Sequence, residues 1–160
     1  TAADLHAQYE FSSAILGKVN EANEAVIAIR RVKAQLEARL EESDDDRLLS
    51  AAATLEDNAS EVEEDIYQVR NRSGQDPLNF PIKVNNRLAN LMSMAEQGDG
   101  RPGNQMSEIF DILVAELADY TDRLQEVWTS DLAAVNRELE RLGLKPINPL
   151  CEPGEACPIV

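Results

Sequence analysis

Carboxylates are the most abundant residues in this chain that could do chemistry. The sequence holds 30 Asp and Glu residues against 15 Lys and Arg, which gives a formal net charge of −15. Two carboxylates at a suitable separation can cleave a glycosidic bond, and glutamates on facing helices can hold two metal ions. However, 30 acids on helices produce some close pairs by composition alone, so their number identifies no catalytic pair.

The single histidine and the lack of glycine-rich motifs argue against several kinds of catalytic and metal site. A di-metal site of this kind also needs a Glu-x-x-His motif, but the only histidine, His6, has no glutamate three residues before it. A Ser-His-Asp or Cys-His centre would also have to use His6, near a chain end where a preorganised site is hard to build. The sequence contains no glycine-rich phosphate loop, Gly-x-Ser-x-Gly elbow or His-Glu-x-x-His motif. We therefore predict no catalytic residue, no cofactor and no metal ligand.

The acidic run EESDDDR, at residues 41–47, is better explained by a helix start than by calcium. Calcium loops need alternating ligands and a glycine turn, and this run has neither. Ser43 is predicted to be the N-cap, with Asp46 at the capping-box position and Asp44 and Asp45 near the positive end of the helix.

The stretch GQDPLNFPIKVNNRLANL, residues 74–91, holds the candidate interaction residues. Two adjacent asparagines lie there inside a predicted helix, where Asn is a weak former. One interpretation is a buried amide bonded to a carbonyl of the loop at residues 76–80. The other is a polar binding patch for a ligand. The candidate residues are Asp76, Asn79, Phe80, Asn85 and Asn86.

The two cysteines lie in the C-terminal tail, LKPINPLCEPGEACPIV. Cys151 and Cys157 enclose a turn-forming segment, so a small local disulfide is sterically reasonable. Such a bond would indicate an extracytoplasmic location. A metal pair would require further ligands nearby, and the tail has none.

Four helical segments must position these residues. Apolar residues recur at spacings of three and four, the pattern of helices packed lengthwise on one another. Gly74, Pro77 and Pro81 are typical of a helix stop, a turn and a helix restart, and Gly143 of a final stop. In the last segment the apolar series steps by one residue at Trp128, which locally changes the supercoil. The predicted helices cover about residues 2–42, 45–72, 81–97 and 105–142.

These segments predict an all-α fold, an antiparallel up-down-up-down four-helix bundle with two long helices. The bundle is expected over residues 1–145, and a non-helical, proline-rich tail over residues 146–160. In the first helix, one heptad series runs from Leu5 to Leu40 and a second from Gln8 to Leu36. Because the third helix is short, some apolar stripe should stay exposed and face a larger parent protein, a second copy or the tail.

The charge limits the choice of partners. Residues 1–73 carry 16 acids and 8 bases and residues 74–160 carry 14 and 7, so the whole surface is anionic. Such a field repels nucleic acid and anionic membranes, and no apolar run approaches the ~20 residues that span a bilayer. Arg30 and Lys33 share a helix face in the only basic cluster. Pairing within the helix, with Glu37, is the simpler explanation, and docking to an acidic neighbour is the alternative.

Three stretches carry a resemblance to a known kind of protein region. They are DPLNFPIKVNNRLANL, GDGRPGNQMSEIFDILVAELADYTDRLQEV and LAAVNRELERLGLKPI, preceded by VNEANEAVIAIRRVKAQLEARL. Together they resemble the helical C-terminal region of large bacterial secreted proteins that carry sortilin-like, Asp-box (BNR-repeat) β-propellers and are often labelled glycosyl hydrolases. The resemblance covers about residues 1–145 and is most specific at PIKVNNRLA, residues 81–89. The tail after Ile147 departs from the pattern.

The resemblance implies an appended C-terminal domain of a larger protein that is periplasmic, cell-surface or secreted. Thr1 in place of a starting Met agrees with a piece of a longer chain. This chain has no Ser-x-Asp-x-Gly-x-Thr-Trp repeat and no strand-rich half, so a hydrolase label would belong to the parent. We expect a non-catalytic structural or interaction module that packs against the propeller or self-associates. The alternatives are an accessory glycan- or peptide-binding domain with a site near residues 76–86, and a carboxylate-based glycosidase.

Overall fold

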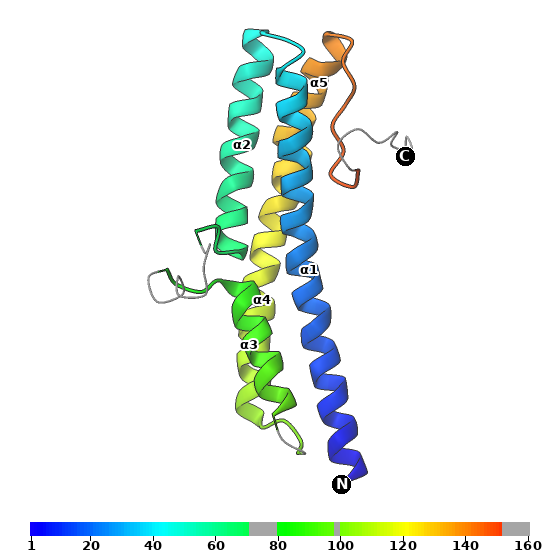
Figure 1. Cartoon of the computed structure of the whole chain (residues 1–160), viewed down its shortest axis with the longest axis vertical. Helices are drawn as coiled ribbons and strands as arrows, with labels where there is room; N and C mark the ends of the chain where they lie inside the picture. The colour runs from blue at the N-terminus through cyan, green and yellow to red at the C-terminus, as the bar shows by residue number, and fades with distance from the viewer. Residues whose placement is uncertain (71–79, 98–99, 152–160) are drawn as a thin grey trace. The chain divides into compact units, whose positions relative to one another are not determined.

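The computed structural model describes residues 1–70, 80–97 and 100–151 (Figure 1). Within these ranges the regular structure is entirely helical. Because α4, η2 and α5 follow one another without a break, they form a single fourth helical run, and the prediction of an all-α fold with four helices and a non-helical tail is confirmed. The elements are α1 (Ala2–Leu40), α2 (Asp46–Ile66), α3 (Val84–Glu96), α4 (Asn104–Val127), the π-helical turn η2 (Trp128–Leu132) and α5 (Ala133–Arg141).

α1 buries one of its two predicted heptad series more completely than the other. Ile15, Ala22, Ile29 and Leu36 of the second series are at most 2% exposed. The prediction was wrong for Leu5, which opens the first series and is half-exposed. An α-helix drifts by about 20° per heptad relative to a strict seven-residue repeat, so Leu5 lies about 60° around the helix from Val26, a buried member of its series.

α2 begins with a different cap from the one predicted. The Oδ1 atom of Asp45 accepts hydrogen bonds from the backbone N–H groups of Arg47 and Leu48, both at 3.1 Å. Asp45 is therefore the N-cap, and its charge also suits the positive helix end. The predicted cap, Ser43, lies two residues earlier and its hydroxyl accepts the N–H of Asp45 at 3.3 Å.

α2 also ends earlier than predicted, at Ile66 rather than near Arg72. The reason lies in Gln68, a buried residue just past the helix end. Its Nε2 donates to the carbonyl of Pro81 at 2.8 Å, and its Oε1 accepts the N–H of Arg70 at 3.3 Å. These bonds give the backbone a turn in place of further helix.

α3 begins three residues later than predicted. Pro81 was expected to restart the helix. Instead the helix starts at Val84, and Lys83 before it has an extended backbone with φ −100° and ψ 177°. The carbonyl of Pro81 is already held by the turn after α2, so it is outside the helical ladder.

The predicted step in the last apolar series corresponds to η2. A π-helical turn holds one residue more than an α-helical turn, which is what a one-residue step in the stripe requires. Thr129 Oγ1 donates to the carbonyl of Gln125 at 3.0 Å, and Ser130 Oγ to that of Glu126 at 2.9 Å. The wider turn alters the spacing of the backbone hydrogen bonds, and these hydroxyls donate to backbone carbonyls four residues earlier.

Gly143 ends the fourth run, as the sequence predicts. It has a positive φ of 72°, which glycine adopts without steric cost. Its N–H donates to the carbonyl of Glu140 at 3.0 Å, and the N–H of Leu144 donates to that of Leu139 at 2.9 Å. This pair of bonds is a Schellman motif. The described tail, residues 144–151, then continues without helix.

The chain divides into two compact units. The first comprises residues 1–24 and 64–121, and the second residues 25–63 and 122–160. In the first unit, Phe11 and Phe110 pack edge to face with ring centroids 5.6 Å apart. Each fully buried aliphatic side chain contributes about 2 kcal/mol by leaving water. Such residues include Ile15, Val84, Leu88, Leu113 and Leu117 in the first unit and Ile29, Val32, Leu48, Leu55, Val135 and Leu139 in the second.

Candidate functional site

The predicted interaction residues are only partly within the described structure. Asp76 and Asn79 lie outside the described residues. Phe80 is half-buried, and the guanidinium carbon of Arg70 lies 5.9 Å from the centroid of its ring. At a partly exposed site such a cation–π contact contributes about 0.5–1 kcal/mol. Phe80 therefore has a partner within its own unit.

Asn85 is buried, and its amide is only partly paired. Its Nδ2 donates to the Oδ1 of Asn23 on α1 at 3.3 Å, and both residues belong to the first unit. Its own Oδ1 is buried and accepts no hydrogen bond in the structure. The prediction of a buried amide is confirmed, but this partner is a side chain of α1 rather than a loop carbonyl. Asn86, next along the chain, is half-buried.

Gln35 holds the C-terminal tail against α1, in the second unit. Its side chain is 6% exposed, and its Nε2 lies 2.8 Å from the carbonyl oxygen of Asn148 and 3.0 Å from that of Cys151. Its Oε1 accepts the N–H of Asn148 at 3.2 Å. One amide thus satisfies backbone groups of the tail that would otherwise be buried without partners, at a cost of about 1–3 kcal/mol each.

Two further side chains bind the same tail. Asn136 of α5 makes a two-way contact with Ile147: its Nδ2 donates to the carbonyl at 3.0 Å and its Oδ1 accepts the N–H at 2.8 Å. Arg39, near the end of α1, donates from Nε to the carbonyl of Lys145 at 2.9 Å. Ile147 itself is 3% exposed. The tail is therefore packed, not loose, at least as far as residue 151.

The predicted disulfide involves this tail. Cys151 is 7% exposed, and its N–H donates to the carbonyl of Asn148 at 3.2 Å. Cys157 lies outside the described residues, so the bond between the two cysteines stays a prediction.

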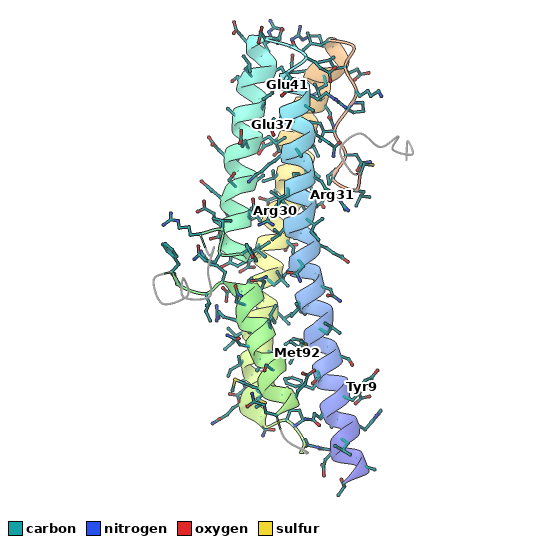
Figure 2. The ribbon with its side chains drawn as sticks, in the orientation of Figure 1. Tyr9, Arg30, Arg31, Glu37, Glu41 and Met92 are labelled. Atoms are coloured by element: carbon teal, nitrogen blue, oxygen red, sulfur yellow. The ribbon has the colours of Figure 1, made fainter. Side chains whose placement is uncertain are left out.

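Glu63 is the most buried carboxylate in the described structure, with a side chain 7% exposed. Two cations of α1 reach it: Arg30 Nε donates to Oε1 and Lys33 Nζ to Oε2, each at 2.7 Å. Figure 2 labels Arg30 on its helix. Lys33 thus pairs with Glu63 of a neighbouring helix in the same chain and not with Glu37, so the predicted pairing within the helix was wrong.

The pKa of Glu63 reflects two opposing effects. Burial favours the neutral acid and acts to raise its pKa, whereas the hydrogen bonds and charges of Lys33 and Arg30 act to lower it. The two cations outweigh burial, and the pKa of Glu63 lies below its ordinary value of 4.5. The carboxylate is therefore charged at neutral pH and serves as a fixed link between α1 and α2.

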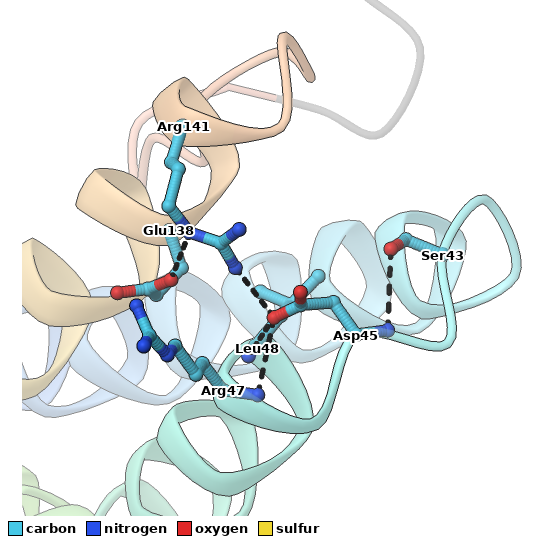
Figure 3. Close-up of polar contacts among 6 residues, drawn as sticks. All are labelled: Ser43, Asp45, Arg47, Leu48, Glu138 and Arg141. Atoms are coloured by element: carbon cyan, nitrogen blue, oxygen red, sulfur yellow. Dashed lines mark hydrogen bonds and ion pairs between the residues drawn. The ribbon is translucent and has the colours of Figure 1, made fainter.

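The cap of α2 is also a link to α5, as Figure 3 shows. Arg141 donates from one guanidinium nitrogen to Asp45 Oδ1 at 2.6 Å and from Nε to Glu138 at 2.7 Å. The hydrogen bond from Arg141, followed by that from the N–H of Leu48, lowers the pKa of Asp45. One carboxylate oxygen thus combines the helix cap with a contact between helices.

The π-helical turn brings Asp131 to α2. The Nδ2 of Asn58 donates to Asp131 Oδ2 at 2.7 Å, and Oδ1 shares the hydroxyl proton of Ser130, at 2.9 Å, with the carbonyl of Glu126. These residues border a shallow hollow of about 290 Å³ whose wall also carries Glu61 and Arg123. π-Helical turns often occur at functional sites, but here both oxygens of Asp131 are occupied by protein donors.

Large exposed apolar side chains complete the surface. Tyr9, 71% exposed, projects from α1 in Figure 2, and Ile112 of α4 is 61% exposed. The others are Leu5, Leu16, Val69, Ile82, Met94 and Ile109 in the first unit and Ile27, Leu49 and Leu150 in the second.

In residues 1–70, 80–97 and 100–151, no three His, Cys, Asp or Glu side chains lie close enough to hold a metal ion. Among the described helices, none combines the length and the apolar character that crossing a membrane requires.

The chain was compared with known proteins. No known family, no curated protein and no solved structure matches it. The function must therefore be argued from the residues themselves.

Proposed function

We propose that this chain is a non-catalytic helical module that holds a fixed geometry and presents a surface to another protein. The observation that carries the proposal is the use of its buried polar side chains. Those buried in the described structure are Gln35, Glu63, Gln68 and Asn85. Each joins two segments of the chain: α1 to the tail, α2 to α1, the end of α2 to Pro81, and α3 to α1. Buried polar groups that are satisfied in only one packing arrangement are what a scaffold of fixed geometry requires.

The exposed apolar residues support the interaction part of the proposal. Contiguous apolar surface on a folded protein marks sites of protein contact. Ile112, Met94 and Ile109 lie at or above 45% exposure within one unit of an otherwise anionic protein. Such side chains are unfavourable in water unless a partner covers them.

The family resemblance suggests what the partner is. We infer that the module is appended to a larger extracytoplasmic protein and packs against its β-propeller or against a second copy of itself. The most specific stretch of the resemblance, residues 81–89, includes Val84, Asn85 and Leu88, which are buried at the start of α3. A motif whose residues form internal contacts agrees with a structural role for this region. The full length of the gene tests the inference: a propeller encoded before Thr1 supports it, and its absence contradicts it.

The isolated chain tests the module hypothesis directly. Sedimentation velocity over a wide concentration range measures self-association, and a broad panel of glycans measures hydrolysis. We expect no turnover of any glycan. Hydrolysis that disappears on replacing a pair of carboxylates would overturn the proposal and revive the glycosidase alternative.

A second candidate function is an accessory glycan- or peptide-binding domain near residues 76–86. The observation that favours it is the Oδ1 of Asn85, a buried acceptor without a donor. Asn85→Ala and Asn86→Ala separate the two functions. Loss of thermal stability with unchanged binding to glycan and peptide arrays supports the scaffold, and loss of binding at unchanged stability supports the ligand site.

A further inference from the structure

The N-terminal half of α4 carries a surface that combines acidic and apolar side chains. We define this acidic face by Glu108, Ile109, Asp111, Ile112 and Asp119, all of them exposed. We propose that the acidic face binds a basic amphipathic helix of another protein. This rests on the interaction role in the proposed function and adds a helical partner that is neither the β-propeller nor a second copy.

The apolar part of the face lies on one side of one helix. Ile112 is 61% exposed and Ile109, three residues earlier, is 45% exposed. Residues three apart are neighbours on a helix surface, so the two side chains form one apolar strip. Helix formation does not require β-branched residues at these positions. Exposed isoleucine side chains are also unfavourable in water. A partner that covers them would remove this apolar area from solvent.

A methionine of α3 extends the strip. Arg87 of α3 donates to Glu116 of α4 at 2.6 Å, which fixes how these consecutive helices of the first unit align. In an antiparallel pair, seven residues forward from Arg87 and seven back from Glu116 lead to Met94 and Ile109, on the same side of the pair. Met94 is 51% exposed. Its flexible thioether suits a surface that adapts to apolar side chains of a partner.

Within the described residues, no cation pairs with Glu108, Asp111 or Asp119 of this face. Residues 104–122 contain five acids and no Lys or Arg. Glu116 is occupied by Arg87 and by the hydroxyl of Tyr120, at 2.6 and 3.2 Å. Glu108, Asp111 and Asp119 form no hydrogen bond or ion pair with the described residues. Relative to Ile112, Glu108 lies one helical turn earlier and Asp119 two turns later, and Asp111 is the preceding residue.

Charge decides which occupant fits this face. A second copy would bring its own net charge of −15, and repulsion between the two copies would oppose pairing. A helix with Lys and Arg beside a leucine stripe would instead place apolar side chains on Ile109 and Ile112 while its cations meet the three carboxylates. Amphipathic helices bind grooves in this way, through anchors at i, i+3, i+4 and i+7. Complementary charge would also speed the encounter.

The test uses the whole chain and a synthetic probe. The probe is an amidated helical peptide of about 18 residues, five turns, with leucines at i, i+3, i+4 and i+7 of each repeat and lysines elsewhere. A peptide of the same composition, shuffled so that the leucines share no face, controls for charge. Isothermal titration measures both. We expect the amphipathic peptide to bind more tightly than the shuffled one by about tenfold, the effect of 1.4 kcal/mol.

Variants locate the binding site. Ile112→Ser is expected to raise the Kd of the amphipathic peptide about tenfold, as removal of a central apolar contact does. Ile27→Ser is the matched control, because Ile27 is an exposed isoleucine on α1 of the other unit; it should change the Kd by less than about twofold. Replacing Glu108, Asp111 and Asp119 by Gln, Asn and Asn should slow association and reduce its salt dependence.

The outcomes are distinct. Equal binding of both peptides, or binding unchanged by Ile112→Ser, would mean attraction of any polycation and would overturn the proposal. Concentration-dependent self-association that Ile112→Ser abolishes would assign the face to a second copy and also overturn it. Failure of the peptide to bind contradicts this inference alone, since the module could act through another surface; glycan hydrolysis would contradict the proposed function itself.

Discussion

The two units of this chain use their polar side chains for different contacts. In the second unit, Gln35 and Asn136 each make two-way contacts with the tail, and Glu63 receives two cations. In the first unit, Gln68 also makes a two-way contact, with Pro81 and Arg70, and Asn85 donates to Asn23 at 3.3 Å. The contacts of the second unit therefore hold the tail and join α2 to α1, whereas those of the first hold the turn after α2 and the start of α3.

Within the described ranges, exposed large apolar side chains are more frequent in the first unit. Of the eleven large apolar side chains exposed in the described ranges, eight belong to the first unit and three to the second. Both buried polar atoms that lack a partner, Ser12 Oγ and Asn85 Oδ1, also lie in the first unit. A unit whose polar groups are satisfied and whose apolar groups are covered is complete by itself. The first unit, by this measure, has surface that a partner would complete.

The largest effect is expected from Gln35→Met. This change keeps the volume of the side chain but removes the donor and the acceptor that hold the tail, leaving the buried carbonyl of Cys151 and the partly buried backbone groups of Asn148 without these bonds. We expect the free energy of unfolding to fall by about 3 kcal/mol, measured by urea denaturation.

The matched change in the first unit is Gln8→Met. Gln8 is half-buried, and the change removes the donor that bonds the carbonyl of Ala95 at 2.7 Å. A loss of about 1 kcal/mol is expected. Equal losses in the two variants would remove the contrast between the units.

Glu63→Gln is expected to have the next largest effect. The neutral amide removes the ion pairs with Lys33 and Arg30, and we expect a loss of about 2 kcal/mol at pH 7, less than for a fully buried pair because Arg30 is half-exposed. Because the pKa of Glu63 is lowered in the folded state, its contribution is present above the ordinary value of 4.5 and is lost as pH falls through the folded pKa.

Denaturation series at several pH values check this linkage. The wild-type chain should lose stability on acidification more steeply than Glu63→Gln, and the two curves should converge in acid. Glu56→Gln, an exposed site on the same helix, is the control and should change stability by less than about 0.5 kcal/mol. Parallel curves for wild type and Glu63→Gln would show that the buried carboxylate does not titrate as argued.

A smaller effect is expected from Asp131→Ala. The change removes the acceptor of Asn58 and of Ser130, which are both partly accessible to water, so the expected loss is about 1 kcal/mol. Thermal unfolding followed by circular dichroism measures it. Asp131→Asn, which keeps one acceptor, should lose less; a loss as large as that of Gln35→Met would mean that the π-helical turn depends on this contact.

Asn85→Leu is expected to have the smallest effect. The substitution removes one long hydrogen bond and one buried oxygen that has no partner, and it adds apolar volume of similar size. Replacing an unsatisfied polar group by an apolar one can be nearly neutral, so the change in stability should stay within about 1 kcal/mol. A loss comparable with that of Gln35→Met would show that the first unit relies on this amide as fully as the second relies on Gln35.

The sequence predicted those features that are encoded locally. Gly143 ends the last helix because only its own conformation is involved, and the step in the apolar series at Trp128 marks η2 because periodicity records an extra residue. The cap of α2 was misplaced by two residues, since Ser43 and Asp45 are both good caps and the contact with Arg141, far along the chain, favours Asp45.

Features that depend on distant parts of the chain were missed. Gln35 meets Asn148 across 113 residues, and nothing in the heptad pattern distinguishes it from other glutamines. Gln68 bonds the carbonyl of Pro81, 13 residues further along the chain, so the predicted continuation of α2 to residue 72 was wrong. For the candidate site, a buried amide was one of the two interpretations of Asn85 and Asn86, but which of them is buried and its contact with Asn23 were not predicted.

The turn at residues 128–132 also has a consequence for changes in chain length. In the α4–α5 run, apolar residues before it, such as Leu124 and Val127, and after it, such as Val135 and Leu139, are out of phase by one residue, and η2 absorbs the difference. Deleting Thr129 would bring the two series into one uninterrupted α-helical repeat. The same one-residue deletion elsewhere in the run would rotate every following side chain by about 100°, which would expose the core residues of α5. The π-helical turn is thus the place where this helix can be shortened with least damage.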